Sequence, residues 1–266
     1  MYSQPKIEVL ISSMFVSNVE DTTKYCSGAS LLINQTDYTK FPNINIQSGI
    51  HRVISNEERG LSKSRNLALK NAIGDICLIA DDDVIYEPDY EQKVQRAYSV
   101  LKDADVIIFD IIKKDKRSTI YKKKRKLGFL TVLKCSSIRI SFKRNSIIDN
   151  GITFNELFGA GTDLFSSGEE NIFLYECLKK KLKIYYFPEV ILTMNSVSST
   201  WFKGYTRKYF NTKGAFAYEI WGAAWFLYVL QFLIRHYIRY RKELSIFKAL
   251  KYCKEGRQIY GYIREK

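Results

Sequence analysis

Histidine is scarce in this sequence, and cysteine pairs are missing. The 266 residues include only two histidines, His51 and His236, and five cysteines that stand far apart without a CxxC pair. Structural zinc sites are built from clusters of these two residue types, so the sequence argues against one. An odd number of scattered cysteines also fits a reducing compartment better than a disulfide-bonded secreted domain.

Targeting signals and repeats are missing as well. Residues 1–8 lack the basic and then apolar order of a signal peptide and lead directly into a strand-like segment. No internal repeat or low-complexity segment stands out. No helix-turn-helix, RNP or zinc-finger pattern is present, so we expect no nucleic-acid partner. The length suits one large domain or two small ones with a full core.

Positive charge is what the sequence has in excess. Lysine and arginine number 42 against 28 aspartates and glutamates, which gives a formal net charge of +14. Such a charge predicts an anionic partner, whether nucleic acid, a membrane surface or a phosphorylated substrate. The densest basic run is Lys113–Lys126. It is either a solvated loop or a segment that meets phosphates of a substrate or of lipid headgroups.

Apolar runs of strand length alternate with helix-length segments through residues 1–200. We expect strands at 7–14, 30–35, 50–55, 76–80, 105–112, 136–142 and 183–187. Ser62 is expected to cap one helix, Pro88 to open a second, and Ser167 or Gly168 to precede a third, while Pro188 is expected to stop the last strand. This order predicts an α/β fold whose mixed, mostly parallel sheet is flanked by helices.

The strand at 76–80 runs directly into Asp81, Asp82 and Asp83. Three adjacent negative charges need water, hydrogen-bond donors or a cation. One interpretation is an acidic turn that follows a core strand. The other is a divalent-metal site at the carboxyl end of a strand, where open α/β sheets place ligands.

The kind of metal site can be narrowed from the neighbouring residues. An EF-hand loop starting at Asp81 requires glycine at its sixth position and glutamate at its twelfth, but these are Tyr86 and Gln92. A hydrolytic two-metal site usually brings more carboxylates or histidines. A single Mg²⁺ or Mn²⁺ that is completed by substrate phosphates needs only one or two carboxylates, and this interpretation fits best.

Two helix starts carry further polar residues. Gly60-Leu61-Ser62 opens a helix with Arg65 and Asn66 near its first turn, where free N–H groups can face an anion. Glu169 and Glu170 lie in the first turn of a later helix, after a glycine loop. Each has a plain structural alternative, because capped surface helices are common and acids near a helix start favour its dipole.

The last third of the chain is apolar, aromatic and basic. Ala215–Ile234 is interrupted by Glu219, Gly222 and Gln231 and is followed by arginines and lysines. Its uninterrupted part is shorter than the ~20 residues that span a bilayer. We therefore expect a C-terminal helical extension that lies on the membrane, with basic flanks that favour anionic lipid. A transmembrane helix, a buried hairpin or a dimer contact are the alternatives.

In this order the motifs resemble the family 2 glycosyltransferases of the GT-A fold, over approximately residues 5–200. The resemblance rests on Gly60–Leu69, Gly74-Asp75, Asp81–Asp83 and Pro88–Tyr90, and on Phe158–Gly161 with Gly168–Glu170, which is similar to the family's Gly-Glu-Asp acceptor-site motif. Ser199–Phe202 through Lys213–Phe216, with the apolar tail, resembles the subgroup that builds bacterial capsule and other surface polysaccharides.

The resemblance implies a Rossmann-like GT-A domain at 1–200, with a nucleotide-sugar half near 1–112 and an acceptor half near 113–200, and an extension at 201–266. It implies nucleotide-sugar binding by Ser12, Asn34, Gln35, Asp37, Arg65, Asn66, Asp81 and Asp82. Asp83, with Asp81, becomes the metal site for Mn²⁺ or Mg²⁺. Gly161 and Glu169 belong to the acceptor region, and Glu170 is the catalytic base.

Two departures from the family pattern matter. Glu170 stands where the family has aspartate, so the base is one methylene longer. The histidine that some relatives carry after the following strand is absent, with Met194 and Asn195 in that region. We therefore expect the metal shell to hold fewer protein ligands.

The expected function is inverting sugar transfer from a nucleotide-diphosphate sugar to a hydroxyl of a glycan or lipid-linked acceptor, in bacterial surface polysaccharide synthesis. We expect a cytoplasmic enzyme, peripheral on the inner face of the cell membrane, with oligomers through the C-terminal helices as an option. A nucleotidyltransferase shares the strand-then-Asp layout, but its glycine-rich basic loop is not seen. A non-catalytic basic module that binds nucleic acid or membrane is favoured only by the charge.

Overall fold

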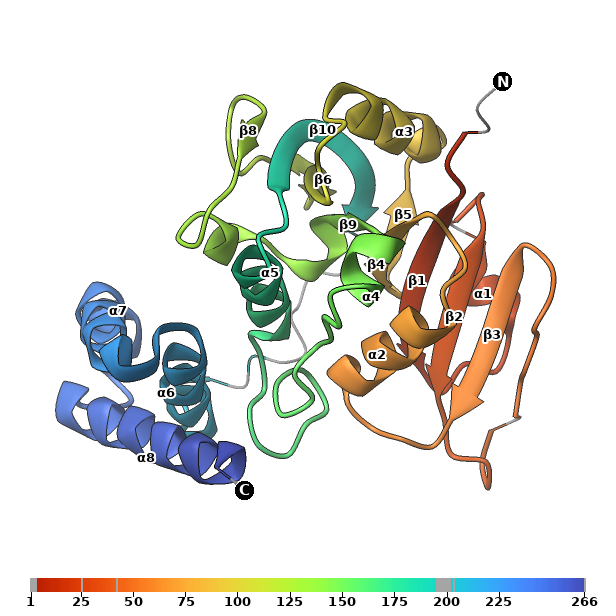
Figure 1. Ribbon diagram of the computed structural model, residues 1–266. Coiled ribbons are helices and arrows are strands. Elements are labelled where there is room, and N and C mark those ends of the chain that lie inside the picture. The colour runs from red at the N-terminus through yellow and green to blue at the C-terminus, as the bar shows by residue number, and fades with distance from the viewer. Residues whose placement is uncertain (1–3, 25, 42, 195–201, 203, 266) are drawn as a thin grey trace.

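The chain folds into an α/β part followed by three C-terminal helices, as a computed structural model shows (Figure 1). The structure describes residues 4–265 except 25, 42, 195–201 and 203, so Asn195 and the Ser199–Trp201 part of the capsule-type segment lie outside the described residues. The strands are β1 Ile7–Met14, β2 Ser30–Gln35, β3 His51–Asn56, β4 Ile76–Asp81, β5 Val84–Tyr86, β6 Val106–Lys113, β7 Lys116–Ser118, β8 Arg125–Lys126, β9 Ile140–Lys143 and β10 Ile184–Met194. The helices are α1 Val19–Thr23, α2 Leu61–Asn71, α3 Tyr90–Val100, α4 Arg144–Ile148, α5 Glu169–Lys179, α6 Arg207–Trp221, α7 Trp225–Tyr240 and α8 Ile246–Arg264, with 3₁₀ turns η1 Val132–Lys134, η2 Ser137–Arg139 and η3 Gly222–Ala224.

One mixed sheet organises the α/β part. Its strand order is β3-β2-β1-β4-β9-β6-β10-β5. The neighbours β3, β2, β1 and β4 run parallel, as do β6 and β10. Strand β9 runs antiparallel between β4 and β6, and β5 runs antiparallel to β10. The expected mixed, mostly parallel sheet is thereby confirmed.

Alternate residues of the central strands build two cores, because successive side chains of a strand point to opposite faces. Val9 and Leu78 join the cluster that α3 covers with Val94 and Tyr98. On the other face Leu10 and Ile79 join the cluster that α2 and α5 cover with Ala68, Leu69, Phe173 and Leu174. The sheet thus lies between helical layers, and its strand ends are left free to carry polar residues.

Four element boundaries differ from the expected ones. Strand β9 begins at Ile140 and not at 136, because residues 137–139 form the 3₁₀ turn η2. Helix α2 is preceded by Gly60, whose φ of +119° suits glycine, and Ser62 instead lies inside the first turn. Helix α3 begins at Tyr90 after Asp89, so Pro88 stands before the helix. Strand β10 continues past Pro188, where its register with β6 shifts. A proline is tolerated there because a bulge needs no ladder N–H at that position.

The C-terminal helices form a unit that packs on the α/β part near α5 (Figure 1). Phe216 and Tyr260 join a core with Phe158 and Phe165 of the loop before α5. The Tyr260 hydroxyl accepts a 2.9 Å hydrogen bond from Asn155 Nδ2, and Lys208 Nζ donates to Thr162 O at 2.8 Å. The extension is therefore docked on the loop that leads to Glu169 and Glu170.

Within this unit, α6 and α8 approach closely at two glycines. A Cβ added at Gly214 would lie 1.8 Å from Cys253 O, and one added at Gly256 would lie 2.0 Å from Asn211 O. Since each glycine faces the backbone of the other helix, the pair sets how near the two helix axes come.

The apolar segment Ala215–Ile234 is divided between two helices rather than forming one. Arg207–Tyr240 is the one stretch among the described residues that is long and apolar enough to cross a membrane by length and composition. Helix α6 ends at Trp221, Gly222 has a φ of +53°, and α7 starts at Trp225. Helix α7 alone has 16 residues.

Candidate active site

A cavity of about 460 Å³ opens where the carboxyl end of β4, the start of α2, the start of α5 and one side of α6 meet. Its acidic wall carries Asp81, Glu169 and Glu170. Its basic residues are Arg65, Lys113, Lys134, Arg139 and Lys213. The basic side chains outnumber the acidic ones, so the cavity suits an anionic ligand.

Arg65 connects the two halves of this cavity. It is 2% exposed, and its Nη1 donates to Glu169 Oε1 at 2.9 Å while its Nη2 donates to Asp81 Oδ1 at 3.1 Å. The guanidinium carbon also lies 5.5 Å from the centre of the Phe154 ring. One cation therefore neutralises a carboxylate at the end of β4 and one at the start of α5, which suits arginine because its planar fork holds two partners at once.

The start of α2 is held by the glycine loop that precedes α5. Leu61 N donates to Ala160 O at 2.9 Å, and the Ser62 hydroxyl donates to Phe158 O at 2.6 Å. The Leu61 N–H is thus already used within the protein, which corrects the expectation of a turn whose N–H groups are all free for an anion. Gly161 has a φ of +77°, and a Cβ added to it would lie 3.4 Å from Gly60 Cα.

Glu170 and Lys213 form the titratable centre of the cavity. Burial, and then the charge of Glu169, raise the pKa of Glu170 to about 8. Burial lowers the pKa of Lys213, and the charge of Glu170 opposes that shift. The Lys213 ammonium also lies 5.3 Å from the centre of the Tyr209 ring. A carboxyl group whose pKa lies near neutral pH, beside a cation, is the arrangement expected of a group that exchanges a proton.

The three aspartates after β4 point to different partners. Asp81 bonds to Arg65, and burial raises its pKa while the charge of Arg65 opposes the shift. Asp82 Oδ2 accepts a hydrogen bond from the Ser13 hydroxyl. The Asp83 carboxylate makes no ion pair or hydrogen bond with the residues that the structure describes.

A resident metal site built only from protein ligands is not found in the described part of the chain, where no group of three His, Cys, Asp or Glu side chains is arranged to hold an ion. Asp83, with the second oxygen of Asp81, nevertheless suits a Mg²⁺ or Mn²⁺ whose remaining ligands are phosphate oxygens and waters. The donor set fits an ion that arrives with a diphosphate.

Four of the predicted site residues come together in the cavity, namely Arg65, Asp81, Glu169 and Glu170. Ser12 lies next to them through its hydroxyl, which accepts a 2.9 Å hydrogen bond from the Ser64 hydroxyl of α2. Gly161 does not line the cavity, although its neighbour Ala160 does.

Asn66 and the residues at and just after the end of β2 lie outside the cavity. Asn66 holds the loop before α5, with Nδ2 donating to Phe154 O at 2.9 Å. Asn34 is fully buried and bonds to both backbone groups of Val16. Gln35 Nε2 donates to Glu58 O and Gly60 O. Asp37 closes a turn, and hydrogen bonds from Thr39 lower its pKa. Nucleotide binding by these four residues stays a prediction.

Lys213 is the site residue that sequence reasoning missed. It enters the cavity from α6, far along the chain from the recognised motifs. The signal was a single lysine between buried residues, since Thr212 and Gly214 on either side are both buried. A lysine in such a place needs an anionic partner or a route to water, and Glu170 is that partner here.

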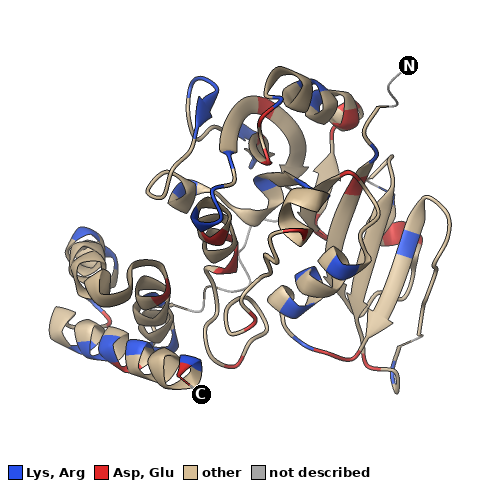
Figure 2. Cartoon of the chain, in the orientation of Figure 1, with Lys and Arg blue, Asp and Glu red and all other residues tan. Residues whose placement is uncertain are grey.

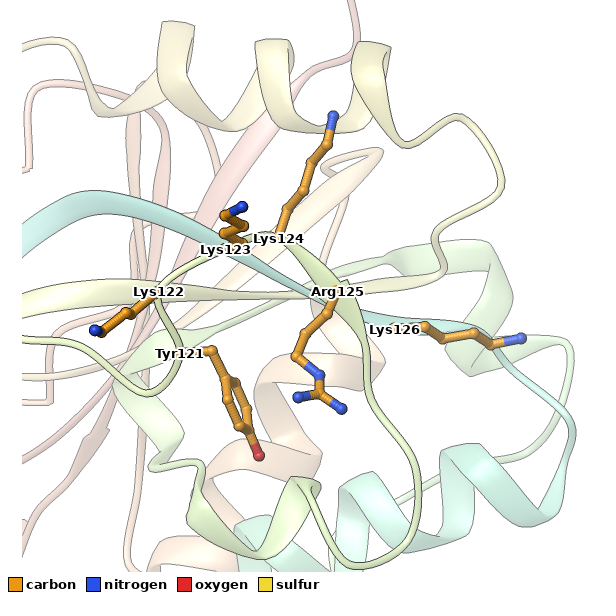
Figure 3. A pocket seen from close by; sticks show the side chains of 6 residues that line it. All are labelled: Tyr121, Lys122, Lys123, Lys124, Arg125 and Lys126. Carbon is orange, nitrogen blue, oxygen red and sulfur yellow. The ribbon is translucent and has the colours of Figure 1, made fainter.

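The basic run begins at the cavity and continues along its outer side. Lys113 and Ser118 line the cavity, while residues 121–126 form a separate exposed hollow. Figure 3 shows the side chains of Lys122, Lys123, Lys124 and Lys126 fanning outward, whereas Arg125 stays near Tyr121, with its guanidinium carbon 4.7 Å from the ring centre. The run is ordered in part by β7 and β8, which pair with β6 and β10.

Comparison with known proteins bears on the fold and on part of the chain. Residues 34–164 match the family model described as Glycosyl transferase family 2. The structure is similar to S. aureus TarS 1-349, with a TM-score of 0.59 at 17% identity, covering 90% of this chain and 73% of that one. Against S. aureus TarS 1-349 in complex with UDP-GlcNAc, the TM-score is 0.63 at 16% identity, with 98% and 92% covered.

Against the longer S. aureus TarS structure, the TM-score is 0.56 at 16% identity, and this chain spans 43% of that one. At such identities the likeness shows the fold, which is GT-A-like with a C-terminal helical region. No curated protein sequence matches this chain significantly.

Proposed function

We propose that this chain, whose residues 34–164 match the model of glycosyltransferase family 2, transfers a sugar from a nucleoside-diphosphate sugar to an acceptor hydroxyl with inversion. The observation that carries the proposal is Glu170, a carboxylate of raised pKa in the wall of a mostly basic cavity, beside the Arg65 bridge. The structure that resembles this chain and is described as bound to UDP-GlcNAc supports testing uridine nucleotides first.

The donor half of the site supplies charge and position. Asp81 is held by its hydrogen bond to Arg65, which is itself buried. A fixed constellation of this kind lowers the cost of orienting a sugar diphosphate, which is a large share of the barrier to group transfer. Lys113 and Lys134 add positive charge to the cavity wall, and such charge stabilises a departing diphosphate.

Glu170 supplies the base for the acceptor. The acceptor O–H gives its proton to the Glu170 carboxylate while the oxygen forms a bond to the anomeric carbon. The bond between that carbon and the phosphate oxygen breaks, and the nucleoside diphosphate leaves with the electron pair. A single displacement from the opposite side inverts the configuration.

The raised pKa of Glu170 answers a difficulty with its position. A carboxylate in the first turn of a helix is normally more acidic, and hence a weaker base. Here burial and Glu169 outweigh the helix dipole and make Glu170 a stronger base. The charge of Lys213 acts in the opposite sense and lowers the pKa of Glu170.

Asp83, with Asp81, would hold Mn²⁺ or Mg²⁺ together with the donor phosphates. When bound, such an ion neutralises charge on the leaving diphosphate. The acceptor is proposed to be a glycan or a lipid-linked glycan of a bacterial surface polysaccharide. The exposed lysines of residues 121–126 either remain solvated or meet phosphates of such an acceptor.

A ligand screen tests the proposal directly. The full chain is heated with UDP, other nucleoside diphosphates and their sugars, with and without Mn²⁺, because ligands of the native state raise the unfolding temperature. We expect one nucleotide sugar to stabilise the protein and, with a glycan acceptor, to release nucleoside diphosphate. Stabilisation by a nucleoside triphosphate with pyrophosphate release, or binding of RNA without any nucleotide, would overturn it.

A further inference from the structure

Helix α7 presents a large apolar surface to solvent. Among its residues Leu227 is 70% exposed, Ile234 62% and Ile238 78%, and Phe226, Leu230 and Tyr237 are also exposed. At about 100° per residue these six side chains cover a sector roughly 120° wide on one side of the helix. The adjoining side of α7, with Val229, Leu233 and Tyr240, is buried against α6 and α8.

One edge of this apolar sector is basic. Gln231, Arg235 and Arg239 follow one another at intervals of about one helical turn, at about 20°, 60° and 100° beyond the Ile238 edge of that sector, and all three are exposed. Arg241 and Lys242 follow the last turn and are exposed too. None of these four cations makes an ion pair with any residue that the structure describes. Figure 2 shows basic residues on both α7 and α8 of this unit.

We infer that this face of α7 docks on an anionic lipid bilayer as an interfacial helix. The apolar sector has the width and position of a surface that enters the acyl region, and the arginines beside it lie where lipid phosphates would be. A second copy of the chain would bring its own row of arginines and lysines against this one, and like charges at a contact oppose association.

The fold favours lying on the bilayer over crossing it. Helix α7 has 16 residues, or about 24 Å, while the hydrocarbon core is about 30 Å thick. Gly222, with a φ of +53°, ends α6 before α7 begins, so the two helices are not one continuous rod. The buried side of α7 also belongs to the core of the helical unit and is not available to lipid.

Vesicle binding tests the inference with the full chain. The probes are sedimented vesicles of phosphatidylcholine alone and of phosphatidylcholine mixed with phosphatidylglycerol. We expect binding to the mixed vesicles that weakens as salt is raised. The double variant Leu227→Glu and Ile238→Glu should lower the partition coefficient tenfold or more, because keeping one such apolar side chain out of the acyl region lowers that coefficient about tenfold.

Two further variants separate apolar from electrostatic binding. Arg235→Gln with Arg239→Gln should lower partition about tenfold on anionic vesicles and change little on neutral ones. Leu130→Glu is the matched control, because Leu130 is 73% exposed but lies outside the helical unit. Far-ultraviolet dichroism and nucleotide binding of each variant report that the fold is kept.

Three results would overturn the inference. The first is equal partition of wild type and the Leu227→Glu, Ile238→Glu variant. The second is a dimer in light scattering that this variant dissociates, with no vesicle binding by wild type. The third is a bound protein that alkaline carbonate does not release, which indicates a spanning helix. None of these outcomes depends on whether the protein transfers sugar, so the proposed reaction is tested separately.

Discussion

Arg65 Nη1 lies 2.9 Å from Glu169 Oε1, and this buried ion pair joins helix α2 to helix α5. The same guanidinium holds Asp81 at the end of β4. One side chain therefore positions the end of β4 against the starts of α2 and α5.

Replacing Arg65 by methionine should destabilise the protein by about 3–5 kcal/mol, because it leaves a buried carboxylate without a counter-charge. Glu169 is only 6% exposed and cannot regain full hydration. Urea denaturation measures the loss. Arg207→Met is the matched control, since its partner is Glu255 at the surface and such pairs contribute about 0–1 kcal/mol. Equal losses of stability in the two variants would show that the buried Arg65 ion pairs contribute no more than a surface ion pair.

Replacing Glu170 by glutamine should lower the transfer rate by about 10²–10⁴-fold, the usual contribution of a general base. Donor binding should persist, because the amide keeps the size of the side chain. Steady-state release of nucleoside diphosphate and a thermal shift with the donor measure the two effects. Glu176→Gln, on the same helix, should leave both unchanged. Full transfer activity in the Glu170 variant removes that residue as the base.

Activity should rise with pH toward a plateau above pH 8, since Glu170 acts as a base only when ionised and burial holds its pKa near 8. Lys213 lowers the pKa of Glu170, so Lys213→Met should move the rise to higher pH. Lys251→Met, an exposed lysine of α8, is the control. The measurement is kcat/KM against pH. An unchanged profile in the Lys213 variant contradicts its contact with the base.

Replacing Asp83 by asparagine should raise the Mn²⁺ concentration needed for half-maximal activity by about tenfold or more, because an anionic ligand becomes neutral. A titration of transfer activity with Mn²⁺ after chelation measures the change. Asp115→Asn, in the exposed basic run, is the matched control. If wild type works fully in chelator, the predicted metal is not needed at all.

Replacing Gly214 or Gly256 by alanine should destabilise the helical unit by about 1–3 kcal/mol or more, the usual cost of overpacking. An added Cβ meets the backbone of the facing helix at 1.8 Å and 2.0 Å, respectively. Gly128→Ala is the control, because a Cβ there meets nothing within 4 Å and its φ is ordinary. Thermal unfolding of the three variants makes the comparison. Equal melting temperatures would mean that α6 and α8 can move apart freely.

The fold was largely predictable, because its central strands are mostly apolar runs of strand length. Strands β1, β2 and β4 begin and end within a residue or so of the predicted positions. Pro188 misled the prediction, since a bulge that tolerates proline is set by pairing with β6 and leaves no local pattern. The break at Gly222 was visible as an interruption, but which helix faces which follows only from packing.

The site was predictable where its residues stand in recognisable local patterns. Arg65, Asp81, Glu169 and Glu170 each follow a helix or strand signal and gather in one cavity. Asn34 and Gln35 were predicted as ligand-binding amides, and in the structure they also bond to neighbouring backbone groups and, for Asn34, to the Ser55 hydroxyl. Lys213 was missed because its role depends on a contact between α6 and α5 that sequence spacing does not reveal.

Strand β5 has a consequence for the order in which the protein assembles. Residues 84–86, directly after the aspartates, pair only with residues 192–194 of β10 among the described strands. β9, likewise, enters the middle of the sheet after β4 and β6 have been made. During synthesis the turn that carries the aspartates therefore cannot complete its strand pairing until nearly the whole α/β part has emerged. Contacts this distant in the chain form slowly. The surroundings of the aspartates are therefore completed late, once β10 has joined the sheet.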